Sequence, residues 1–359
     1  MKKIARLLIV IMALAVLSIT AFPETLNLLG IVAEPPKAYY LDEITDTAQK
    51  VKALTKEPAL VFFLCSDVHY NTVKTDNRLK LDSVTDMTTN MAALKKQIPV
   101  DGLICLGDIV DAKEPTKAEE TKMQVEYVMK RLRGVGLPLI YCMGNHDDNR
   151  YAYSVDSTVF SAKQLESMYM SYTLPNRVSD LSTNGLNYYV DYDRHKIRVF
   201  ALDSNYQDPN KNYHWAHGFS DSTLAWFRDR LKEIPKGWSV MVLAHRRLVQ
   251  SKNPEKDWIH NQLIMAETVN DFINNGGSYI ATVYGHIHRD LSRKEPFLEF
   301  SIGSQKCQNI EVEKGNAIAP ERKLNTASED LWDVLVIRPQ SRKINTVRFG
   351  AGADREWSY

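Results

Sequence analysis

From residue 59 onward, apolar residues fall into short runs that are separated by stretches of helical periodicity. Runs rich in β-branched and aromatic residues predict strands, here at residues 60–65, 103–106, 139–143, 197–202, 240–244 and 279–284. Between them, apolar side chains step by three and four, which is typical of one face of a helix. These stripes are Val84, Met87, Met91, Leu94 and Ile98; Val125, Val128 and Leu132; Leu224, Phe227 and Leu231; and Ile259, Leu263 and Ala266. The alternation predicts parallel strands covered by helices.

The pattern changes after residue 290. Strand-like runs at 297–302, 334–338 and 344–349 follow one another without helical stretches between them. They predict a second, more antiparallel sheet packed on the first. We therefore interpret residues 59–359 as one large α/β domain, and residues 23–58 as a leader segment with a short helix around 44–54.

The composition is that of a globular protein, with 359 residues, 44% hydrophobic and 25% charged. A chain of this length buries enough surface to need no disulfide framework. The 45 Lys and Arg balance 44 Asp and Glu, which argues against a nucleic-acid partner. The four cysteines include no CxxC pair. Cys65, Cys105 and Cys142 lie in apolar runs and are expected to be small buried side chains, whereas Cys307 stands alone.

Residues 1–22 have the features of a secretory signal. Basic residues at the start precede an apolar run at 7–17, and the small Ala21 offers a cleavage position. The run is shorter than the ~20 residues that span a bilayer comfortably. The sequence thus predicts cleavage near residue 22 and an extracytoplasmic protein, whether secreted, periplasmic or at the cell surface. The alternatives are an uncleaved membrane anchor, the only case in which we expect membrane association, and a buried helix.

Polar clusters follow five of the predicted strands. Ligands bind beyond the carboxyl ends of parallel strands, so clusters far apart in sequence are expected to converge. The clusters are Ser66-Asp67-Val68-His69, Gly107-Asp108-Ile109-Val110-Asp111, Gly144-Asn145-His146-Asp147, His245 and Gly285-His286-Ile287-His288. Each alone is explained by capping or by a turn, but five at strand ends are not. Their glycines are expected to let the backbone turn sharply.

The clusters supply oxygen and nitrogen donors and no thiolate. This mixture suits divalent Mn, Fe, Zn, Ni or Co and is too rich in nitrogen for calcium. A two-metal site with a bridging carboxylate uses about seven protein ligands. Seven are present: Asp67, His69, Asp108, Asn145, His245, His286 and His288. On an extended segment, the Asp-x-His and His-x-His spacings would point both side chains of a pair the same way.

The ordered series Asp-x-His, Gly-Asp-x-x-Asp, Gly-Asn-His-Asp, His and Gly-His-x-His resembles that of the calcineurin-like metallophosphoesterase superfamily. It extends over roughly residues 60–290. The resemblance implies a two-sheet β-sandwich flanked by helices, in four layers. The stretch 347–352 also resembles the end of some extracytoplasmic members.

The resemblance also implies roles for the site residues. One metal would be held by Asp67, His69, Asp108 and His288, and the other by Asp108, Asn145, His245 and His286, with Asp108 as the bridge. His146 would lie over the leaving group as general acid, oriented by Asp147.

The chain departs from parts of the family in two places. Ala112 stands where members that hydrolyse phosphoproteins often carry arginine, which disfavours that role. Asp111 stands where purple acid phosphatases carry a tyrosine, which disfavours a tyrosinate–iron site. In addition, Arg246 and Arg247 follow His245, and they either add positive charge near a phosphate or face solvent.

These features predict a dinuclear metal-dependent phosphoesterase that hydrolyses a phosphate mono- or diester by attack of a metal-bound hydroxide. The alternatives are a non-catalytic binding or scaffold protein that retains the fold, and a hydrolase of a non-phosphate ester. The sequence does not name the substrate: monoesters, cyclic nucleotides, nucleotide-sugar diphosphates and phospholipid headgroups are all open. Specificity is assigned to loops 148–190 and 204–222, which carry Tyr151, Tyr153, Tyr188, Tyr206, Tyr213 and Trp215. His214 and His217 lie in the second loop, which either lines the cleft or is an ordinary loop.

Overall fold

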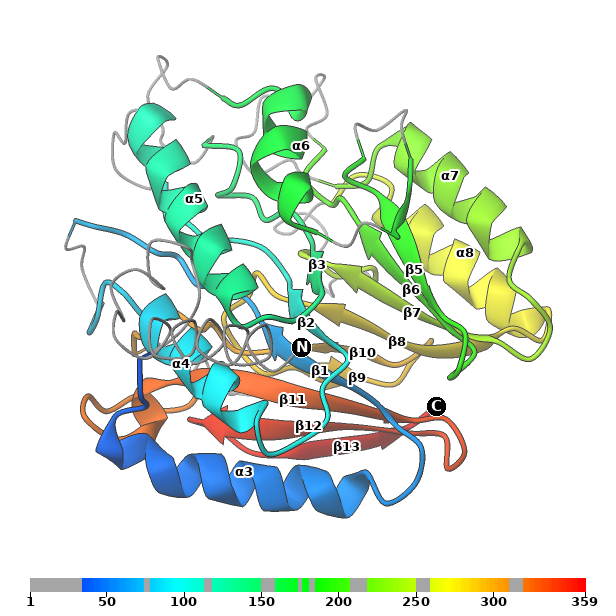
Figure 1. Cartoon of the computed structure of the whole chain (residues 1–359). Coiled ribbons are helices and arrows are strands. Elements are labelled where there is room, and N and C mark those ends of the chain that lie inside the picture. The colour runs from blue at the N-terminus through cyan, green and yellow to red at the C-terminus, as the bar shows by residue number, and fades with distance from the viewer. Residues whose placement is uncertain are drawn as a thin grey trace, which may run out of the picture.

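The computed structural model of the chain describes residues 34–73, 78–112, 118–149, 159–173, 176–180, 185–206, 218–249, 259–309 and 319–359. The predicted signal segment 1–22 lies outside these residues, as do the loop residues Tyr151, Tyr153, Tyr213, His214, Trp215 and His217. Within the described ranges, two mixed β-sheets pack against each other and carry helices on their outer sides (Figure 1). None of the helices in these ranges is both long and apolar enough to cross a membrane.

The first sheet has six strands in the order β13-β12-β11-β1-β2-β3. Its parallel half consists of β1 (Leu60–Cys65), β2 (Gly102–Cys105) and β3 (Leu139–Tyr141). Its antiparallel half consists of β11 (Leu331–Arg338), β12 (Lys343–Gly350) and β13 (Arg355–Ser358). The two halves join where β1 pairs antiparallel with β11.

The second sheet has seven strands in the order β4-β5-β6-β7-β8-β10-β9. Parallel neighbours form its centre: β6 (Ile197–Leu202), β7 (Ser239–Ala244), β8 (Ser278–Tyr284) and β10 (Glu299–Ser301). Antiparallel strands complete both edges: β4 (Val178–Ser179), β5 (Tyr188–Tyr192) and β9 (Ser292–Arg293).

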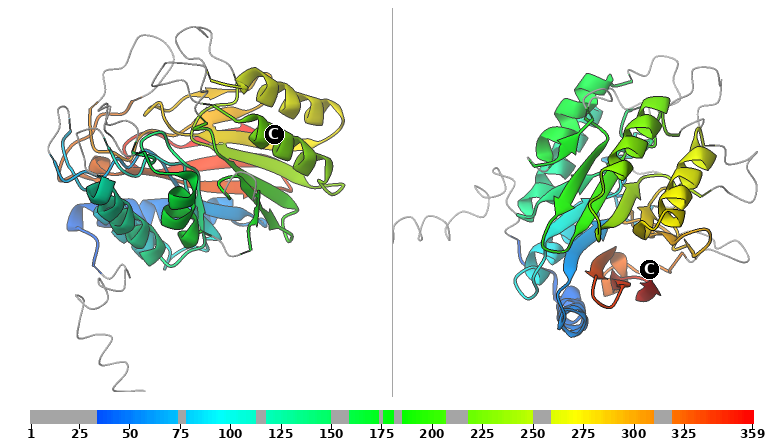
Figure 2. Two further views of the ribbon diagram at one scale, coloured as in Figure 1. Left: turned by 90° about the horizontal axis from the view of Figure 1, so that it is seen from above. Right: turned by 90° about the vertical axis from the view of Figure 1, so that its right-hand side faces the viewer.

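Helices cover the outer sides of this pair of sheets, as the views in Figures 1 and 2 show. On the six-stranded side lie α3 (Leu41–Leu54), α4 (Val84–Leu94), α5 (Ala118–Gly134) and the short α6 (Ala162–Tyr169). On the other side lie α7 (Asp221–Lys232) and α8 (Gln262–Asn274). Short 3-10 turns complete the described elements: η1 (Ala38–Tyr40), η2 (Met170–Tyr172) and η4 (Ala327–Glu329).

Alternating side chains on the central strands divide the core into two parts. Val199 of β6 and Met241 of β7 belong to the large core that also includes apolar residues of the six-stranded sheet and of α3–α6. The next residues along, Phe200 and Val242, pack with α7 and α8 in a smaller core. Because successive side chains of a strand point to opposite faces, this pattern gives helix, sheet, sheet and helix layers. The predicted four-layer sandwich is confirmed.

The pairing of the closing strands corrects one prediction. We expected 297–302, 334–338 and 344–349 to form a separate, more antiparallel sheet. Instead, β10 pairs in parallel with β8, and β11 pairs with β1, so both sheets are mixed. An apolar run indicates that a strand is buried, but it does not indicate which strand pairs with it.

The helices confirm most of the predicted stripes and correct one. Leu263 of the stripe 259–266 is 55% exposed, whereas α8 buries Met265, Ala266 and Val269. The predicted short helix in the leader is present as α3, which buries Ile44 in the large core. The boundary of the leader stays a prediction. Cys65, Cys105 and Cys142 are free and buried, as expected, and Cys307 is free and buried as well.

Glu299 of β10 provides a test of stability against pH. Its buried carboxyl accepts hydrogen bonds from the backbone N–H groups of Leu248 and Val249 at 2.7 and 3.0 Å. Burial raises the pKa of Glu299 from its ordinary value of 4.5 to about 7, even though these bonds, Arg293 and Arg247 lower it. Between these values the unfolded chain is ionised at this position and the folded protein is not. The free energy of unfolding should therefore fall as pH rises through this window, by about 3 kcal/mol.

Urea unfolding of the wild type and Glu299→Gln at about pH 5 and about pH 8 measures this contribution. The substitution should remove the loss that Glu299 causes while keeping an oxygen acceptor for both N–H groups. Equal changes in the wild type and the variant would refute the assignment.

Candidate metal centre

All five predicted clusters lie at the carboxyl ends of strands from both sheets. β1, β2 and β3 deliver Asp67, Asp108 and Asn145 from the six-stranded sheet, while β7 and β8 deliver His245 and His286 from the other. Backbone contacts join the two sets, because the N–H of His286 donates to both carboxylate oxygens of Asp67 at 3.1 and 3.0 Å. The predicted convergence is therefore present, at the edge where the two sheets meet.

A first group of donors consists of Asp67, His69 and His288. His69 Nε2 lies 2.9 Å from His288 Nε2, and Asp67 Oδ1 lies 3.4 Å from His288 Nε2 and 3.8 Å from His69 Nε2. Here two imidazole nitrogens face each other beside a carboxylate. A cation between them would accept a lone pair from each of the three groups. The group therefore fits a divalent metal.

A second group consists of Asp108, His245 and His286. Asp108 Oδ2 lies 3.1 Å from His245 Nε2 and 3.7 Å from His69 Nε2, so this oxygen faces both groups. Asn145 Oδ1 lies 3.1 Å from His245 Nε2. All seven predicted ligands thus lie together, and the donor set fits two metals that share Asp108. Their ligand roles stay a prediction.

The charges of the site favour neutral histidines at two positions. Burial, with the charge of His146, lowers the pKa of His69 to about 3. Burial and Arg246 lower the pKa of His286 well below its ordinary value. Neutral imidazole is the form that binds metals.

His245 behaves differently from the other two histidines. Burial alone would lower its pKa, but the charge of Asp108 outweighs it and raises the pKa of His245 to about 9. Metal binding at this position would therefore release a proton.

The predicted ligands leave the strands on strained backbone. Positive φ angles occur at Asp67 (54°), His69 (47°), Asp108 (52°), His286 (68°) and His288 (57°). Such conformations cost about 1–3 kcal/mol each and persist where the surroundings impose them, often at functional sites. The extended geometry in which both side chains of an Asp-x-His or His-x-His pair point the same way is therefore not the one present. The side chains project from left-handed turns.

The three cluster glycines allow backbone geometry that a side chain would prevent. Gly107 has a φ of 93° and does require the left-handed region. Gly144 and Gly285 are needed for close approach instead. A Cβ at Gly144 would overlap the backbone nitrogen and Oδ1 of Asp108, and one at Gly285 would overlap the hydroxyl of Ser66.

Asp147 holds the turns that present the ligands. Its buried carboxylate accepts hydrogen bonds from the N–H groups of Asp108 and Ile109 at 2.9 Å and of Gly144 at 2.7 Å. The Tyr141 hydroxyl donates to the same carboxylate at 2.5 Å. Burial and the charge of Asp108 raise the pKa of Asp147 to about 7. These contacts tie the turn after β2 to the turn after β3.

His146 lies beside both groups of donors. Its backbone N–H donates to Asp108 Oδ1 at 2.8 Å, and its ring Nδ1 lies 2.5 Å from the carbonyl oxygen of Asp111. Its Nε2 lies 3.9 Å from Asp108 Oδ2. The orientation of this ring by Asp147 stays a prediction, whereas the contact at Nδ1 is made by Asp111.

Three residues on the Nδ1 side of His69 were not predicted as part of the site. The carboxylate of Asp111 lies 3.2 Å from His69 Nδ1, which orients the ring and favours Nε2 as the ligand atom. Lys306 Nζ and Arg78 Nη2 lie 3.5 and 3.6 Å from the same carboxylate. Asp111 was visible within the second cluster, but no local pattern marked Arg78 or Lys306.

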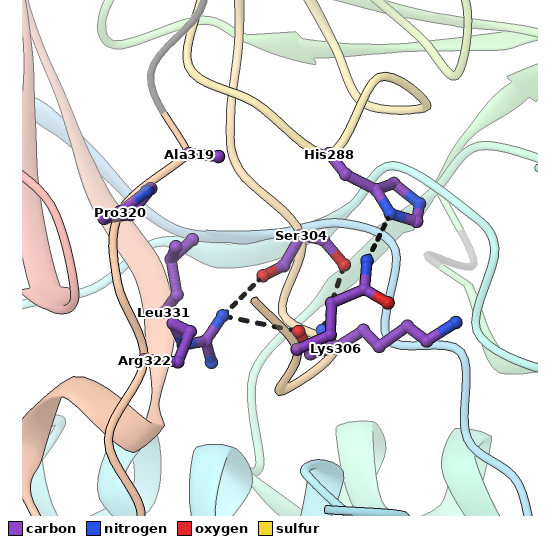
Figure 3. A pocket seen from close by; sticks show the side chains of 8 residues that line it. His288, Ser304, Lys306, Ala319, Pro320, Arg322 and Leu331 are labelled. Carbon is purple, nitrogen blue, oxygen red and sulfur yellow. Dashed lines mark hydrogen bonds between the residues drawn. The ribbon is translucent and has the colours of Figure 1, made fainter. Parts of the chain in front are cut away.

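A small pocket of about 10 Å³ adjoins His288 (Figure 3). Arg322 binds the carbonyl oxygens of Ser304 and Lys306 on one side of it. The amide nitrogen Nε2 of Gln308 lies 3.0 Å from His288 Nδ1. If His288 binds metal through Nε2, its Nδ1 carries the proton. The amide of Gln308 must then be turned over, so that its oxygen accepts this proton in a hydrogen bond.

Gln308→Ala should therefore lower metal affinity by about 10- to 100-fold, as expected for loss of a partner that orients a ligand. Gln308→Glu is the matched variant, because it keeps an acceptor at the same place and should retain tight binding. Titration of metal-free protein, prepared with a chelator, measures the metal affinity of both variants. Equal affinity in the wild type and Gln308→Ala would contradict this role.

Comparison with known proteins agrees with this geometry. The family model described as calcineurin-like phosphoesterase matches residues 60–290. A search of curated proteins gives no match. Among solved structures, the chain is similar to a dimetal phosphatase of Danio rerio, with a TM-score of 0.61, 14% identity, and coverage of 84% of this chain and 100% of that one. It is also similar to a purple acid phosphatase of yellow lupin, with a TM-score of 0.54, 12% identity, and coverage of 84% and 54%. At these identities the likeness shows the fold alone.

Proposed function

Because the chain belongs to the calcineurin-like phosphoesterase family, we propose that it is a dinuclear metal-dependent hydrolase of phosphate mono- or diesters. The observation that carries this proposal is the position of Asp108 Oδ2, which lies 3.1 Å from His245 in one group of donors and 3.7 Å from His69 in the other. Two such ions supply, when bound, an acidic site for a water molecule and charge compensation for phosphoryl oxygens. The two groups would hold divalent transition metals.

We assign to His146 the transfer of a proton to the leaving group. It is 8% exposed, and the carbonyl of Asp111 accepts the hydrogen of Nδ1 in both the neutral and the charged ring. Nε2 is then the nitrogen that gains or loses a proton. This nitrogen lies on the side of Asp108, where it can donate to the departing oxygen.

Elemental analysis of the purified protein, followed by a panel of mono- and diesters with the metal found, tests the proposal. His146→Ala should lower turnover by about 10²- to 10⁴-fold, as expected for loss of a general acid, while both metals stay bound. Absence of hydrolysis across the panel by metal-loaded protein would refute the proposed function. Loss of metal from His146→Ala would refute the role of this histidine.

We further propose that the protein acts outside the cytoplasm. The basic residues, the apolar run and Ala21 in residues 1–22 support export. N-terminal sequencing of the exported protein should find a chain that begins near residue 22. An intact Met1 would count against cleavage.

A further inference from the structure

Arg246 is a buried cation beside the candidate metal centre. It follows His245 directly at the end of β7 and is 5% exposed. Its backbone N–H donates to the Ser204 hydroxyl at 3.0 Å. Its Nε is enclosed, and among the described residues it has no hydrogen-bond partner. A buried guanidinium without a partner is costly, so such groups normally face a carboxylate or another anion.

No described carboxylate is dedicated to this guanidinium. Burial lowers the pKa of Arg246 to about 10, and the opposing negative charge is that of Asp108. Asp108 is already in contact with the ring of His245 and with the backbone of His146. In turn, the charge of Arg246 lowers the pKa of His286. The guanidinium therefore adds positive charge at the second group of donors.

We propose that Arg246 binds the terminal phosphate of the substrate and makes the site prefer phosphate monoesters to diesters. This inference rests on the proposed function and names the substrate class of the same site. Arginine matches phosphate geometry with paired hydrogen bonds. A monoester presents three terminal oxygens and close to two negative charges near neutral pH, whereas a diester presents fewer terminal oxygens and a single charge. The monoester thus compensates an unpaired buried cation more fully.

The test compares Arg246→Met and Arg246→Lys with Arg247→Met. Arg247 is the matched control, because it is the neighbouring arginine, is only half-buried and is not adjacent in sequence to a predicted ligand. Calorimetry with inorganic phosphate on the metal-loaded protein gives binding. Kinetics with p-nitrophenyl phosphate and bis(p-nitrophenyl) phosphate give kcat/KM for the two ester classes. Metal content is measured on every preparation.

Arg246→Met should weaken phosphate binding and lower monoester kcat/KM by about 10- to 100-fold, the value of a hydrogen-bonded charge. Diester kcat/KM should fall by less than about 3-fold, because a diester makes weaker hydrogen bonds and charge interactions with the Arg246 guanidinium. Metal content should not change. Arg246→Lys should recover part of the loss, and Arg247→Met should stay within about 2-fold of the wild type, as for most substitutions away from a site.

An Arg246→Met protein that keeps its metals and binds phosphate as tightly as the wild type overturns the inference. So does an equal loss for both esters. If this variant does not fold, the wild type decides, because a higher kcat/KM for the diester also overturns the inference. A wild type that binds phosphate through Arg246 but hydrolyses no ester would refute the proposed function and leave the phosphate contact standing.

Discussion

Asp108→Asn should abolish hydrolysis and remove bound metal together. The carboxylate places Oδ2 towards both groups of donors, at 3.1 Å from His245 Nε2 and 3.7 Å from His69 Nε2. Asparagine keeps the shape and can still accept the N–H of His146, now received by Oδ1 at 2.8 Å. The substitution therefore removes mainly the negative charge. Bound metals stabilise the transition state by several kcal/mol, and loss of this stabilisation corresponds to a fall of at least about 10³-fold in kcat/KM.

Asp101→Asn is the matched control. Asp101 directly precedes Gly102, the first residue of β2, and is exposed. Its carboxylate accepts a hydrogen bond from the N–H of Val61 at 2.8 Å. Asparagine can make the same bond, so activity and metal content should match the wild type. Elemental analysis and kinetics on the same preparations measure both variants. Two metals per chain in Asp108→Asn would contradict the bridging role. The pKa of His245 should also fall, because the charge of Asp108 is what raises it.

Arg348→Met should cause the largest loss of stability among the substitutions considered. Arg348 is buried, and its guanidinium donates to Asp333 Oδ1 at 2.7 Å, to Asp290 Oδ1 at 2.9 Å and to the carbonyl of Ala351 at 2.8 Å. Removal of one member of a buried ion pair leaves uncompensated charge and costs about 3–5 kcal/mol. Arg355 lies 3.2 Å from Asp333 Oδ2 and 3.5 Å from Asp290 Oδ1, so we expect the lower end, about 3 kcal/mol.

The control for this variant lies on the same strand. Lys343 of β12 pairs with Glu356 at 2.6 Å, with side chains 39% and 44% exposed. Exposed pairs contribute less than about 1 kcal/mol, so Lys343→Met should unfold close to the wild type in urea. If Arg348→Met lost no more stability than Lys343→Met, the buried network would not stabilise the fold. Asp290 follows His288 by two residues, so Arg348→Met should also weaken metal binding at the first group of donors.

Features that depend on residues close in sequence were predictable. The apolar runs located β1 and β6 at their exact bounds, because a strand buried on both faces is a continuous apolar segment. The weakly apolar β13 and the eight-residue α6 were missed. β13 has few apolar residues, and α6 is too short to give a long periodic stripe, although it begins at a capping box formed by Ser161 and Gln164.

The kinds of donor atoms and their positions at strand ends were predictable, because these are properties of single residues and of local order. Asp67, Asp108, Asn145 and His245 could be identified on that basis before any fold was known. Three features follow from the three-dimensional packing alone: β1 pairs with β11, Asp147 binds two turns together, and Gln308 contacts His288. The packing also buries Arg246 without a carboxylate of its own among the described residues. Burial and charge compensation depend on segments that are distant in the chain, and the sequence contains no local signal for which of them will meet.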